Sequence, residues 1–335
     1  MNQPVLVTGA AGFIGAAVCE RLLERGERVV GIDNLNGYYD PALKQARLDR
    51  LDGIASSAPL PSAVGQGLWS FHRLDLADGE AMADLFAATQ PRAVVHLAAQ
   101  AGVRYSLENP AAYIQANLVG LGHILEGCRH HGVEHLVYAS SSSVYGGNRA
   151  MPFAEGQPVN HPVSLYAATK KANELMAHTY SHLYDLPATG LRFFTVYGPR
   201  QRPEMAIHQF TRRIAQGQPV VLYGDGSTSR DYTYIADIVD GVVRALDRCA
   251  GYEIYNLGES ATTSLSELVQ WIGEACGREV LLDRQPMQSG DVVLTCADVT
   301  KARADQAIWA ALLTPQGKWL ADFFLIATGD VLLLD

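Results

Sequence analysis

The sequence has few of the features that mark secreted, metal-binding or membrane-spanning proteins. Its five cysteines, at positions 19, 128, 249, 276 and 296, are scattered and form no C-x-x-C pair. This usage fits a reducing cytoplasm and argues against a structural zinc site, so we expect no metal. No apolar run reaches the ~18 residues that a membrane helix needs. Residues 1–8 also lack the basic segment of a signal peptide, and instead predict a first strand.

Positive charge is also scarce. The formal net charge of −9 argues against nonspecific nucleic-acid binding, and an anionic ligand would need a local basic cluster. The remaining composition, 48% apolar and 18% charged, is ordinary for a globular protein. The 335 residues suffice for one large α/β domain or two linked domains.

Glycines cluster where the first predicted strand meets the first predicted helix. Gly9, Gly12 and Gly15 follow the apolar residues 4–8 and precede the helical pattern of residues 16–25. Such glycines permit a tight turn and let backbone N–H groups approach a pyrophosphate, although a merely structural turn is the alternative. Asp33 ends the second predicted strand. A carboxylate there can bind the adenosine ribose and repels a 2′-phosphate, which indicates NAD rather than NADP.

The remaining pattern alternates strands with helices. Further strands are predicted at residues 69–76, 93–99 and 134–139, and helices at 41–51, 81–89 and 111–131, with a surface loop at 52–67. The alternation predicts an α/β fold, a Rossmann-like doubly wound parallel sheet. We expect residues 1–185 to form the NAD-binding domain, with a strand at 188–197 returning to it. Residues 198–335 should mainly form a smaller, interleaved substrate-binding lobe. His96, within an apolar strand, is expected to be a core histidine.

A tyrosine and a lysine lie four residues apart at Tyr166 and Lys170. On the helix predicted for residues 165–184 they share one face, one turn apart. A nearby ammonium should lower the tyrosine pKa from about 10 towards useful acid–base chemistry. Such a pair also occurs by chance on solvated helices. The glycine turn and a serine run at 140–143, at the end of an apolar strand, favour the catalytic interpretation.

Arginines gather in the C-terminal part of the chain, at positions 200, 202, 212, 213 and 230. Guanidinium groups bind phosphates through paired hydrogen bonds, so a nucleotide diphosphate clamp is one interpretation. A solvated face is the other, and we favour it for Arg212 and Arg213. Arg202 and Arg230 fall in predicted loops, and we expect them to bind a diphosphate.

Together these motifs resemble the extended short-chain dehydrogenase/reductase family. The resemblance covers about residues 3–304 and is greatest to the nucleotide-sugar 4-epimerases, especially those acting on UDP-glucuronate. The residues that carry it are the glycine turn, Asp33, the serine run and the Tyr166–Lys170 pair, together with the stretches 33–44, 96–106, 164–174 and 191–199.

The resemblance implies roles for individual residues. Ser141 would hydrogen-bond the reacting 4-OH, Tyr166 would be the acid–base, and Lys170 would hold the nicotinamide ribose. The implied NAD contacts are Gly9, Gly12, Phe13, Ile14, Gly15, Asp33, Asn34, Asn36, Asp75, Leu76, Leu97, Ala98, Ala99, Gln100, Asn117, Ser140, Tyr166, Lys170 and Phe194. The implied UDP-sugar contacts are Arg104, Ser141, Ser142, Ser143, Thr195, Arg202, Met205, Arg230 and Asp291.

The serine run helps to separate related reactions. In similar sugar 4,6-dehydratases, Asp and Glu stand at the positions of Ser142 and Ser143, and in UDP-xylose synthase Glu stands at the second. Hydroxyl groups cannot supply that acid–base chemistry, but they can bind a substrate carboxylate, and Thr195 also matches the glucuronate pattern. We therefore expect C4 epimerisation of UDP-glucuronate to UDP-galacturonate through a 4-keto sugar, with tightly bound NAD. UDP-glucose/UDP-galactose epimerisation, decarboxylation and a non-catalytic NAD-binding regulator are the alternatives.

The resemblance also implies a homodimer, built by the helices predicted at 111–131 and 165–184, and a place in polysaccharide biosynthesis. It fails near the end of the chain, where a terminal helix rich in aromatic and charged residues is expected. Residues 310–335 are instead largely apolar. The packing of the last ~30 residues is therefore atypical for the family, while an exposed apolar tail would favour aggregation.

Overall fold

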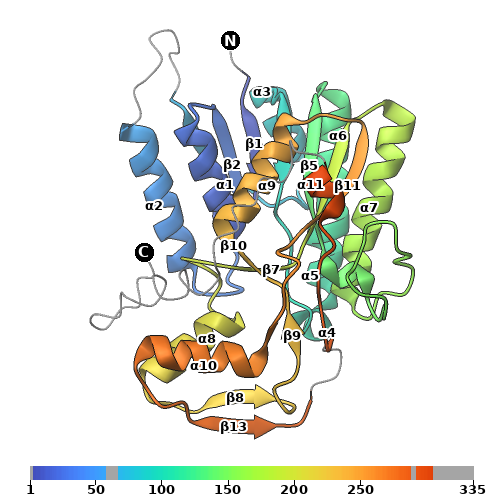
Figure 1. Ribbon diagram of the computed structural model, residues 1–335. Coiled ribbons are helices and arrows are strands. Elements are labelled where there is room, and N and C mark those ends of the chain that lie inside the picture. The colour runs from blue at the N-terminus through green and yellow to red at the C-terminus, as the bar shows by residue number, and fades with distance from the viewer. Residues whose placement is uncertain (1–2, 58–66, 288–291, 305–335) are drawn as a thin grey trace.

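The computed structural model describes residues 3–57, 67–287 and 292–304. A seven-stranded sheet lies at its centre in the order β11-β6-β5-β4-β1-β2-β3, with every neighbouring pair parallel (Figure 1). Its strands are β1 (Val5–Thr8), β2 (Val29–Asp33), β3 (Trp69–Arg73), β4 (Ala93–His96), β5 (His135–Ser141), β6 (Ala188–Phe193) and β11 (Tyr252–Leu257). The strand order reverses beside β1, and ligands bind in such sheets at the carboxyl ends of the strands next to that reversal.

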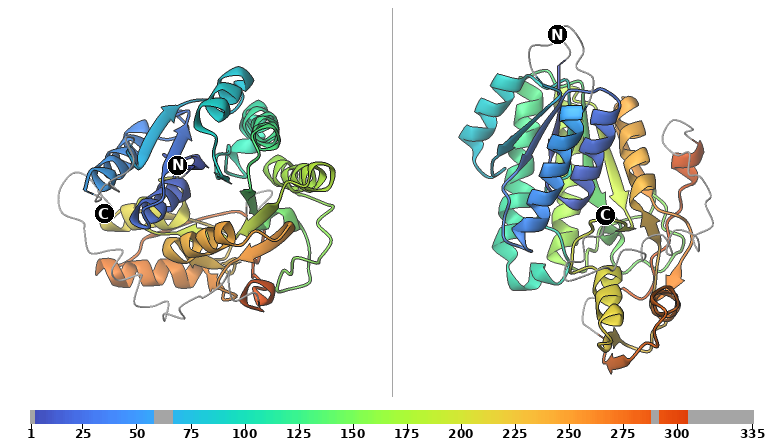
Figure 2. Two further views of the ribbon diagram at one scale, coloured as in Figure 1. Left: turned by 90° about the horizontal axis from the view of Figure 1, so that it is seen from above. Right: turned by 90° about the vertical axis from the view of Figure 1, so that its left-hand side faces the viewer.

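Helices cover both faces of the sheet, as the view from above shows (Figure 2). One face carries α1 (Phe13–Glu24), α2 (Pro41–Ser57) and α9 (Ile235–Asp247), and the other carries α3 (Gly79–Thr89), α6 (Gly120–His130) and α7 (Leu165–Tyr184). Each layer has its own apolar core against the sheet. The central strands are therefore buried on both sides, which is why they are almost entirely apolar. The predicted doubly wound fold is confirmed. Across the described ranges, no helix is both long and apolar enough to span a bilayer.

The chain returns to this sheet twice after α7. The first return is β6, as expected. The second is β11, which pairs in parallel with β6, while α9 packs against the sheet beside α1. The lobe predicted to take up most of residues 198–335 therefore does not include α9 and β11, which pack with the sheet. The apolar face of α9 fits a helix of either domain, so the local pattern could not assign it.

Two helix boundaries differ from expectation. Helix α2 continues to Ser57, so the first residues of the predicted 52–67 loop are helical, and residues 58–66 lie outside the described part. The helix predicted at 111–131 is divided into α5 (Pro110–Tyr113), a π-helical segment η1 (Ile114–Val119) and α6. π-Helical turns inside α-helices are rare and frequently occur at functional sites.

A smaller lobe lies at the carboxyl end of the sheet, below it in Figure 1. Its apolar core joins α8 (Ala206–Ala215), β8 (Val220–Tyr223) and α10 (Leu265–Cys276), and β13 (Leu282–Gln285) pairs with β8. Two short pairs connect the lobe to the sheet: β7 (Thr195–Tyr197) with β10 (Tyr232–Tyr234), and β9 (Ser229–Arg230) with β12 (Thr263–Ser264). The remaining elements are α4 (Tyr105–Glu108), the 3₁₀ turn η2 (Ser142–Tyr145) and α11 (Thr300–Ala304). The atypical end of the chain, residues 305–335, lies outside the described residues.

Candidate active site

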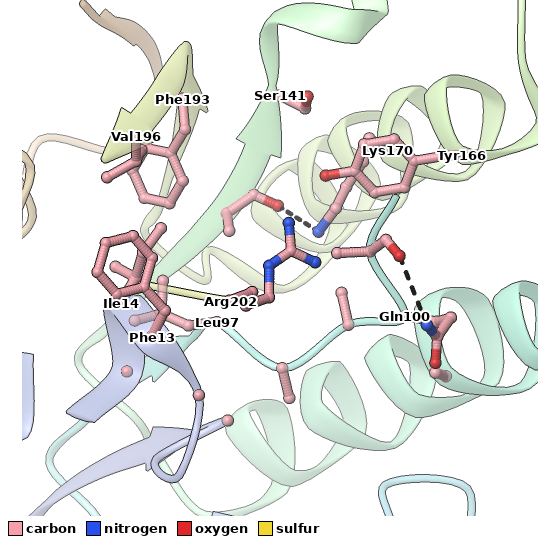
Figure 3. Close-up of a pocket in the computed structure, with 18 of the residues that line it drawn as sticks. Phe13, Ile14, Leu97, Gln100, Ser141, Tyr166, Lys170, Phe193, Val196 and Arg202 are labelled. Atoms are coloured by element: carbon pink, nitrogen blue, oxygen red, sulfur yellow. Dashed lines mark hydrogen bonds between the residues drawn. The ribbon is translucent and has the colours of Figure 1, made fainter. Parts of the chain in front are cut away.

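A cavity of about 510 Å³ lies between the carboxyl edge of the sheet and the lobe (Figure 3). It brings together most of the residues predicted to contact cofactor or substrate. The predicted residues in its lining are Gly9, Gly12, Phe13, Ile14, Gly15, Asp33, Asn34, Asn36, Asp75, Leu76, Leu97, Ala98, Ala99, Gln100, Ser140, Ser141, Ser142, Ser143, Tyr166, Lys170, Phe194, Thr195, Arg202, Met205 and Arg230.

The glycine turn leaves the start of α1 open to the cavity. Gly9 has φ +71°, a left-handed conformation that favours glycine. A Cβ on Gly15 would lie 2.0 Å from the Gly9 carbonyl oxygen, so no larger residue fits there. The N-cap residue Gly12 offers no side chain to cap the helix, so the first N–H groups remain available. An uncapped helix start on a close-packed turn fits a pyrophosphate group.

The far end of the cavity is held by an ion pair that the sequence patterns did not reveal. Lys44 on α2 is only 5% exposed, and its Nζ lies 3.3 Å from Asp33 Oδ1 and 3.1 Å from Asn36 Oδ1. The same Asp33 oxygen accepts from the Leu35 N–H at 2.8 Å, which orients the carboxylate at the end of β2. Asn34 donates to Asp75 at 2.9 Å. Lys44 lies in the stretch 33–44 that carries the family resemblance, and that was the available signal.

Tyr166 and Lys170 project from one face of α7 into the same side of the cavity, opposite Phe13, Ile14 and Leu97 (Figure 3). Ser164 caps the helix by accepting from the Ala167 N–H, which fixes where α7 begins. Lys170 is 2% exposed, and its Nζ donates to the Ala139 carbonyl at 2.8 Å. Burial lowers the pKa of Lys170 to about 8, because the ammonium has little water around it.

The expected lowering of the Tyr166 pKa is not found. Burial raises the pKa of Tyr166 above its ordinary value, while a hydrogen bond with Ser141 and the charge of Arg202 act in the opposite direction. Removal from water disfavours the phenolate more than these neighbours favour it. The spacing predicted a shared helix face correctly, but spacing alone cannot weigh burial against charge.

Ser141 lies at the end of β5 and is the N-cap of η2. Its Oγ accepts from the Ser143 N–H at 3.1 Å and from the Ser143 hydroxyl at 2.9 Å. Ser142 and Ser143 were expected at a strand end, but they lie in the η2 turn that follows it. In this arrangement the Ser143 hydroxyl must rotate away from Ser141 before it can donate to a ligand.

Ser140 points its hydroxyl away from a ligand role and into a buried network. It donates to Glu174 Oε1 at 2.7 Å, and Glu174 forms a paired contact with Arg192 through Nε–Oε1 at 2.8 Å and Nη2–Oε2 at 2.9 Å. Glu174 lies one turn beyond Lys170 on α7, and Arg192 lies on β6. The network therefore joins α7, β5 and β6 directly behind the catalytic candidates.

Of the predicted contact residues that the structure describes, two do not line the cavity. Asn117, in the π-helical segment, uses its amide to hold the Gln100 backbone N–H and carbonyl at 2.8 and 3.1 Å and the Thr169 hydroxyl at 3.0 Å. It therefore positions the Gln100 loop against α7 and does not face a ligand. The Arg104 guanidinium lies over the ring of Tyr223, 5.2 Å from its centroid.

Polar side chains predicted to bind the substrate also line the cavity. Arg202 reaches into the middle of the cavity and pairs with Glu204, with Nη1 3.1 Å from Oε1 (Figure 3). Arg230 donates to the Ser229 carbonyl at 3.0 Å, and Thr195 begins β7. Asp291 lies outside the described residues. The lining also contains residues that the sequence patterns did not single out, among them Tyr38, Tyr39, Lys44, Phe193, Val196 and Thr295.

His96 is a core residue, as expected. It is 2% exposed and forms a 2.8 Å hydrogen bond through Nδ1 with the Thr8 hydroxyl. Burial and the charge of Lys170 lower its pKa to about 3, so the ring is neutral at physiological pH. It therefore carries no catalytic charge.

Comparison with known proteins finds similar proteins that are named as UDP-sugar 4-epimerases. A UDP-glucuronate 4-epimerase of Thermodesulfobacterium geofontis is 41% identical over 299 residues, which cover 89% of this chain and 88% of that relative. The crystal structure of a UDP-glucuronic acid 4-epimerase from Bacillus cereus, in complex with UDP-glucuronic acid and NAD, matches with a TM-score of 0.84 and 31% identity, covering 95% of this chain and 96% of that one. A UDP-glucose 4-epimerase from Thermotoga maritima with UDP-glucose matches with a TM-score of 0.83 and 30% identity, covering 95% and 96%.

The family match covers residues 5–258, which include the glycine turn, the serine run and the Tyr166–Lys170 pair. The chain therefore belongs to the NAD dependent epimerase/dehydratase family.

Proposed function

We propose that the chain is an isomerase, an NAD-dependent UDP-glucuronate 4-epimerase that forms UDP-galacturonate. The observation that carries the proposal is the grouping of Tyr166, Lys170 and Ser141 beside a dinucleotide cavity, next to hydroxyl groups rather than carboxylates at residues 142 and 143. The relatives named UDP-glucuronate 4-epimerase, which match nearly the whole chain, support the same substrate.

The residues of the cavity fit NAD at three points. The uncapped start of α1 suits the pyrophosphate, Asp33 suits the adenosine ribose hydroxyls, and Lys170 suits the nicotinamide ribose. When bound, NAD supplies a reversible hydride acceptor whose positive ring also favours the phenolate of Tyr166. The Asp33 carboxylate would repel a 2′-phosphate, which favours NAD over NADP.

Tyr166 is the proposed acid–base. It accepts the proton of the sugar 4-OH as C4 is oxidised, and returns a proton to O4 when the 4-keto sugar is reduced on its opposite face. Ser141 hydrogen-bonds Tyr166 and is proposed to orient the sugar O4 as well. Lys170 fixes its ammonium against the Ala139 carbonyl and so places a positive charge one helical turn from the tyrosine.

Ser142, Ser143 and Thr195 are proposed to hold the C5 carboxylate. A ketone at C4 is β to that carboxylate, and β-keto acids lose CO₂ when the breaking bond aligns with the carbonyl π system. Hydrogen bonds from these residues can hold the carboxylate out of this alignment, after the Ser143 hydroxyl has rotated away from Ser141. All three residues line the cavity, from η2 and from the start of β7.

Thr195→Ala should therefore raise the fraction of decarboxylated UDP-4-keto-pentose and slow epimerisation. The measurement is the product ratio in single-turnover reactions with UDP-glucuronate. Thr179→Ala, an exposed threonine on α7, is the control and should leave the ratio unchanged. An unchanged ratio in Thr195→Ala would remove Thr195 from the carboxylate site.

Epimerisation of UDP-glucose is the second candidate, because a UDP-glucose 4-epimerase has nearly the same fold. Separate incubation with UDP-glucuronate and UDP-glucose, with chromatographic resolution of the products, distinguishes the two. We expect UDP-galacturonate from the first and little turnover of the second. Efficient turnover of UDP-glucose alone would replace the proposed substrate.

We also propose a homodimer that acts in the cytoplasm. Helices α6 and α7 lie side by side at one edge of the molecule (Figure 1). Leu175 and Leu183 on α7 are 57% and 59% exposed, as apolar residues that meet a second copy would be. All five cysteines are free thiols, which supports a reducing compartment.

A further inference from the structure

Arg47, on α2, joins three segments that border the cavity. Its Nη1 donates to the Ala11 carbonyl at 2.9 Å and lies 2.6 Å from the Tyr39 hydroxyl. Its Nη2 donates to the Arg200 carbonyl at 2.5 Å. Ala11 belongs to the glycine turn, Tyr39 to the loop after β2, and Arg200 to the segment that leads from β7 into the lobe. One planar guanidinium thus connects the proposed cofactor side with the proposed substrate side.

The Arg47 side chain is buried, but its hydrogen bonds are incomplete. Arg47 is 2% exposed, and its Nε has no hydrogen-bond partner among the described residues. A buried N–H without a partner destabilises the folded state. Burial, as the main cause, lowers the pKa of the guanidinium, and the positive charge of Arg202 contributes to the same lowering. The two guanidinium groups are therefore close enough to interact.

The segment held by Arg47 contains the proposed diphosphate ligand. Arg200 has φ +58°, a left-handed conformation that is unfavourable for a residue with a side chain. Its carbonyl is turned towards Arg47, and its side chain reaches Glu20 on α1 at 3.9 Å. Arg202 follows two residues later and points into the cavity (Figure 3). The Arg200 carbonyl and the Arg200 side chain therefore both contact helices of the proposed cofactor-binding domain.

We infer that Arg47 is a positioning residue that sets the distance between the glycine turn and Arg202, so that substrate and cofactor diphosphates bind in fixed register. This inference rests on the proposed function, since it takes Arg202 as a UDP ligand. Arg47 does not touch either ligand in this account. It acts through the backbone of residues 200–202.

The test uses the holoenzyme with Arg47→Met and Arg47→Lys. We expect both variants to raise the KM for UDP-glucuronate and the Kd for UDP by about tenfold, with a smaller change in kcat. The reason is the loss of one or two hydrogen bonds that hold the backbone of residues 200–202 in place. Lysine keeps the charge but cannot reach three acceptors in one plane, so it should not rescue UDP affinity. Arg213→Met is the matched control, because Arg213 also donates to a backbone carbonyl, that of Pro219, but outside the cavity.

A double-mutant cycle with Arg202→Ala separates positioning from general destabilisation. If Arg47 acts through Arg202, Arg47→Lys should weaken UDP binding strongly in the wild-type background and hardly at all in Arg202→Ala. Additive effects on the UDP Kd, or unchanged UDP affinity in both Arg47 variants, would overturn the inference. These outcomes leave the proposed function intact if the wild type still epimerises UDP-glucuronate. A wild type that neither binds UDP nor turns over the sugar would instead remove the proposed function.

Discussion

Burial shifts the pKa values of both groups at the proposed catalytic centre. Tyr166 and Lys170 are each shifted towards the neutral form, the tyrosine by a raised pKa and the lysine by a lowered one. Removal from water therefore disfavours a charge on either side chain. The positive ring of bound NAD would add to the charge of the Lys170 ammonium and so favour the phenolate of Tyr166.

Tyr166→Phe should keep the fold and bound NAD while lowering kcat by roughly 10²–10⁴-fold, the usual contribution of a positioned acid–base. The ring would still pack against Tyr113, 6.2 Å away between centroids, so the variant loses the hydroxyl alone. Turnover is measured with UDP-glucuronate, and NAD content after denaturation is the control. Near-wild-type turnover would remove Tyr166 from the mechanism.

Lys170 should also contribute to the pH dependence of the free energy of unfolding. Because its pKa is lowered from 10.5 to about 8, the unfolded chain holds more protons at this residue between those pH values. Its contribution to the free energy of unfolding therefore rises with pH through this window, by up to about 3 kcal/mol.

Urea unfolding of wild type and Lys170→Met, at pH 7.5 and at higher pH, measures this contribution. The stability difference should shift in favour of the wild type as the pH rises, while the titration of other groups cancels in the comparison. A difference that does not vary with pH would mean that Lys170 is not desolvated.

At the level of elements, the strand-to-helix turn before α1 depends on the absence of side chains. A Cβ on Gly15 would lie 2.0 Å from a backbone oxygen, and backbone cannot move aside as a flexible side chain can. The start of α1 would have to shift away from β1. The N–H groups that we propose as pyrophosphate ligands would shift with it.

Gly15→Ala should therefore purify with little or no NAD and with reduced thermal stability. Gly122→Ala on α6 is the control, because no described atom outside its own helix backbone lies within 4 Å of the place its methyl group would take, and alanine favours helix there. We expect that control to retain NAD and to be slightly more stable. The cofactor released on denaturation is quantified by its absorbance, and full NAD occupancy in Gly15→Ala would contradict the proposed contact.

At the scale of the whole molecule, the exposed face of α7 is the strongest candidate for contact between copies. Leu175 and Leu183 lie on that face, away from the cavity-facing Tyr166 and Lys170. The proposed dimer contact would therefore lie on the helix that carries the proposed catalytic pair without covering the cavity.

Leu175→Glu combined with Leu183→Glu should convert a dimer into a monomer, because two desolvated carboxylates would face their copies across a two-fold axis. Analytical ultracentrifugation measures the mass, and Leu281→Glu, at a residue 51% exposed in the lobe, is the control. If the double variant keeps the mass of the wild-type dimer, the interface lies elsewhere.

The sequence by itself determined the features that depend on local geometry. Alternating apolar strands and helices predicted the parallel sheet, the glycines predicted an open start for α1, and the spacing of Tyr166 and Lys170 predicted a shared helix face. Each of these follows from the period of a helix, the pleat of a strand or the freedom of glycine. A few neighbouring residues are enough to define them.

Only the tertiary structure decided the features that depend on distant partners. Arg47 meets Arg200 across 153 positions, and β11 joins β6 although residues of the lobe lie between them in the chain. The direction of the Tyr166 pKa shift also depends on distant partners, because burial results from everything that packs around the ring. Desolvation and long-range hydrogen bonding arise only when separate segments come together, and no local pattern contains that information.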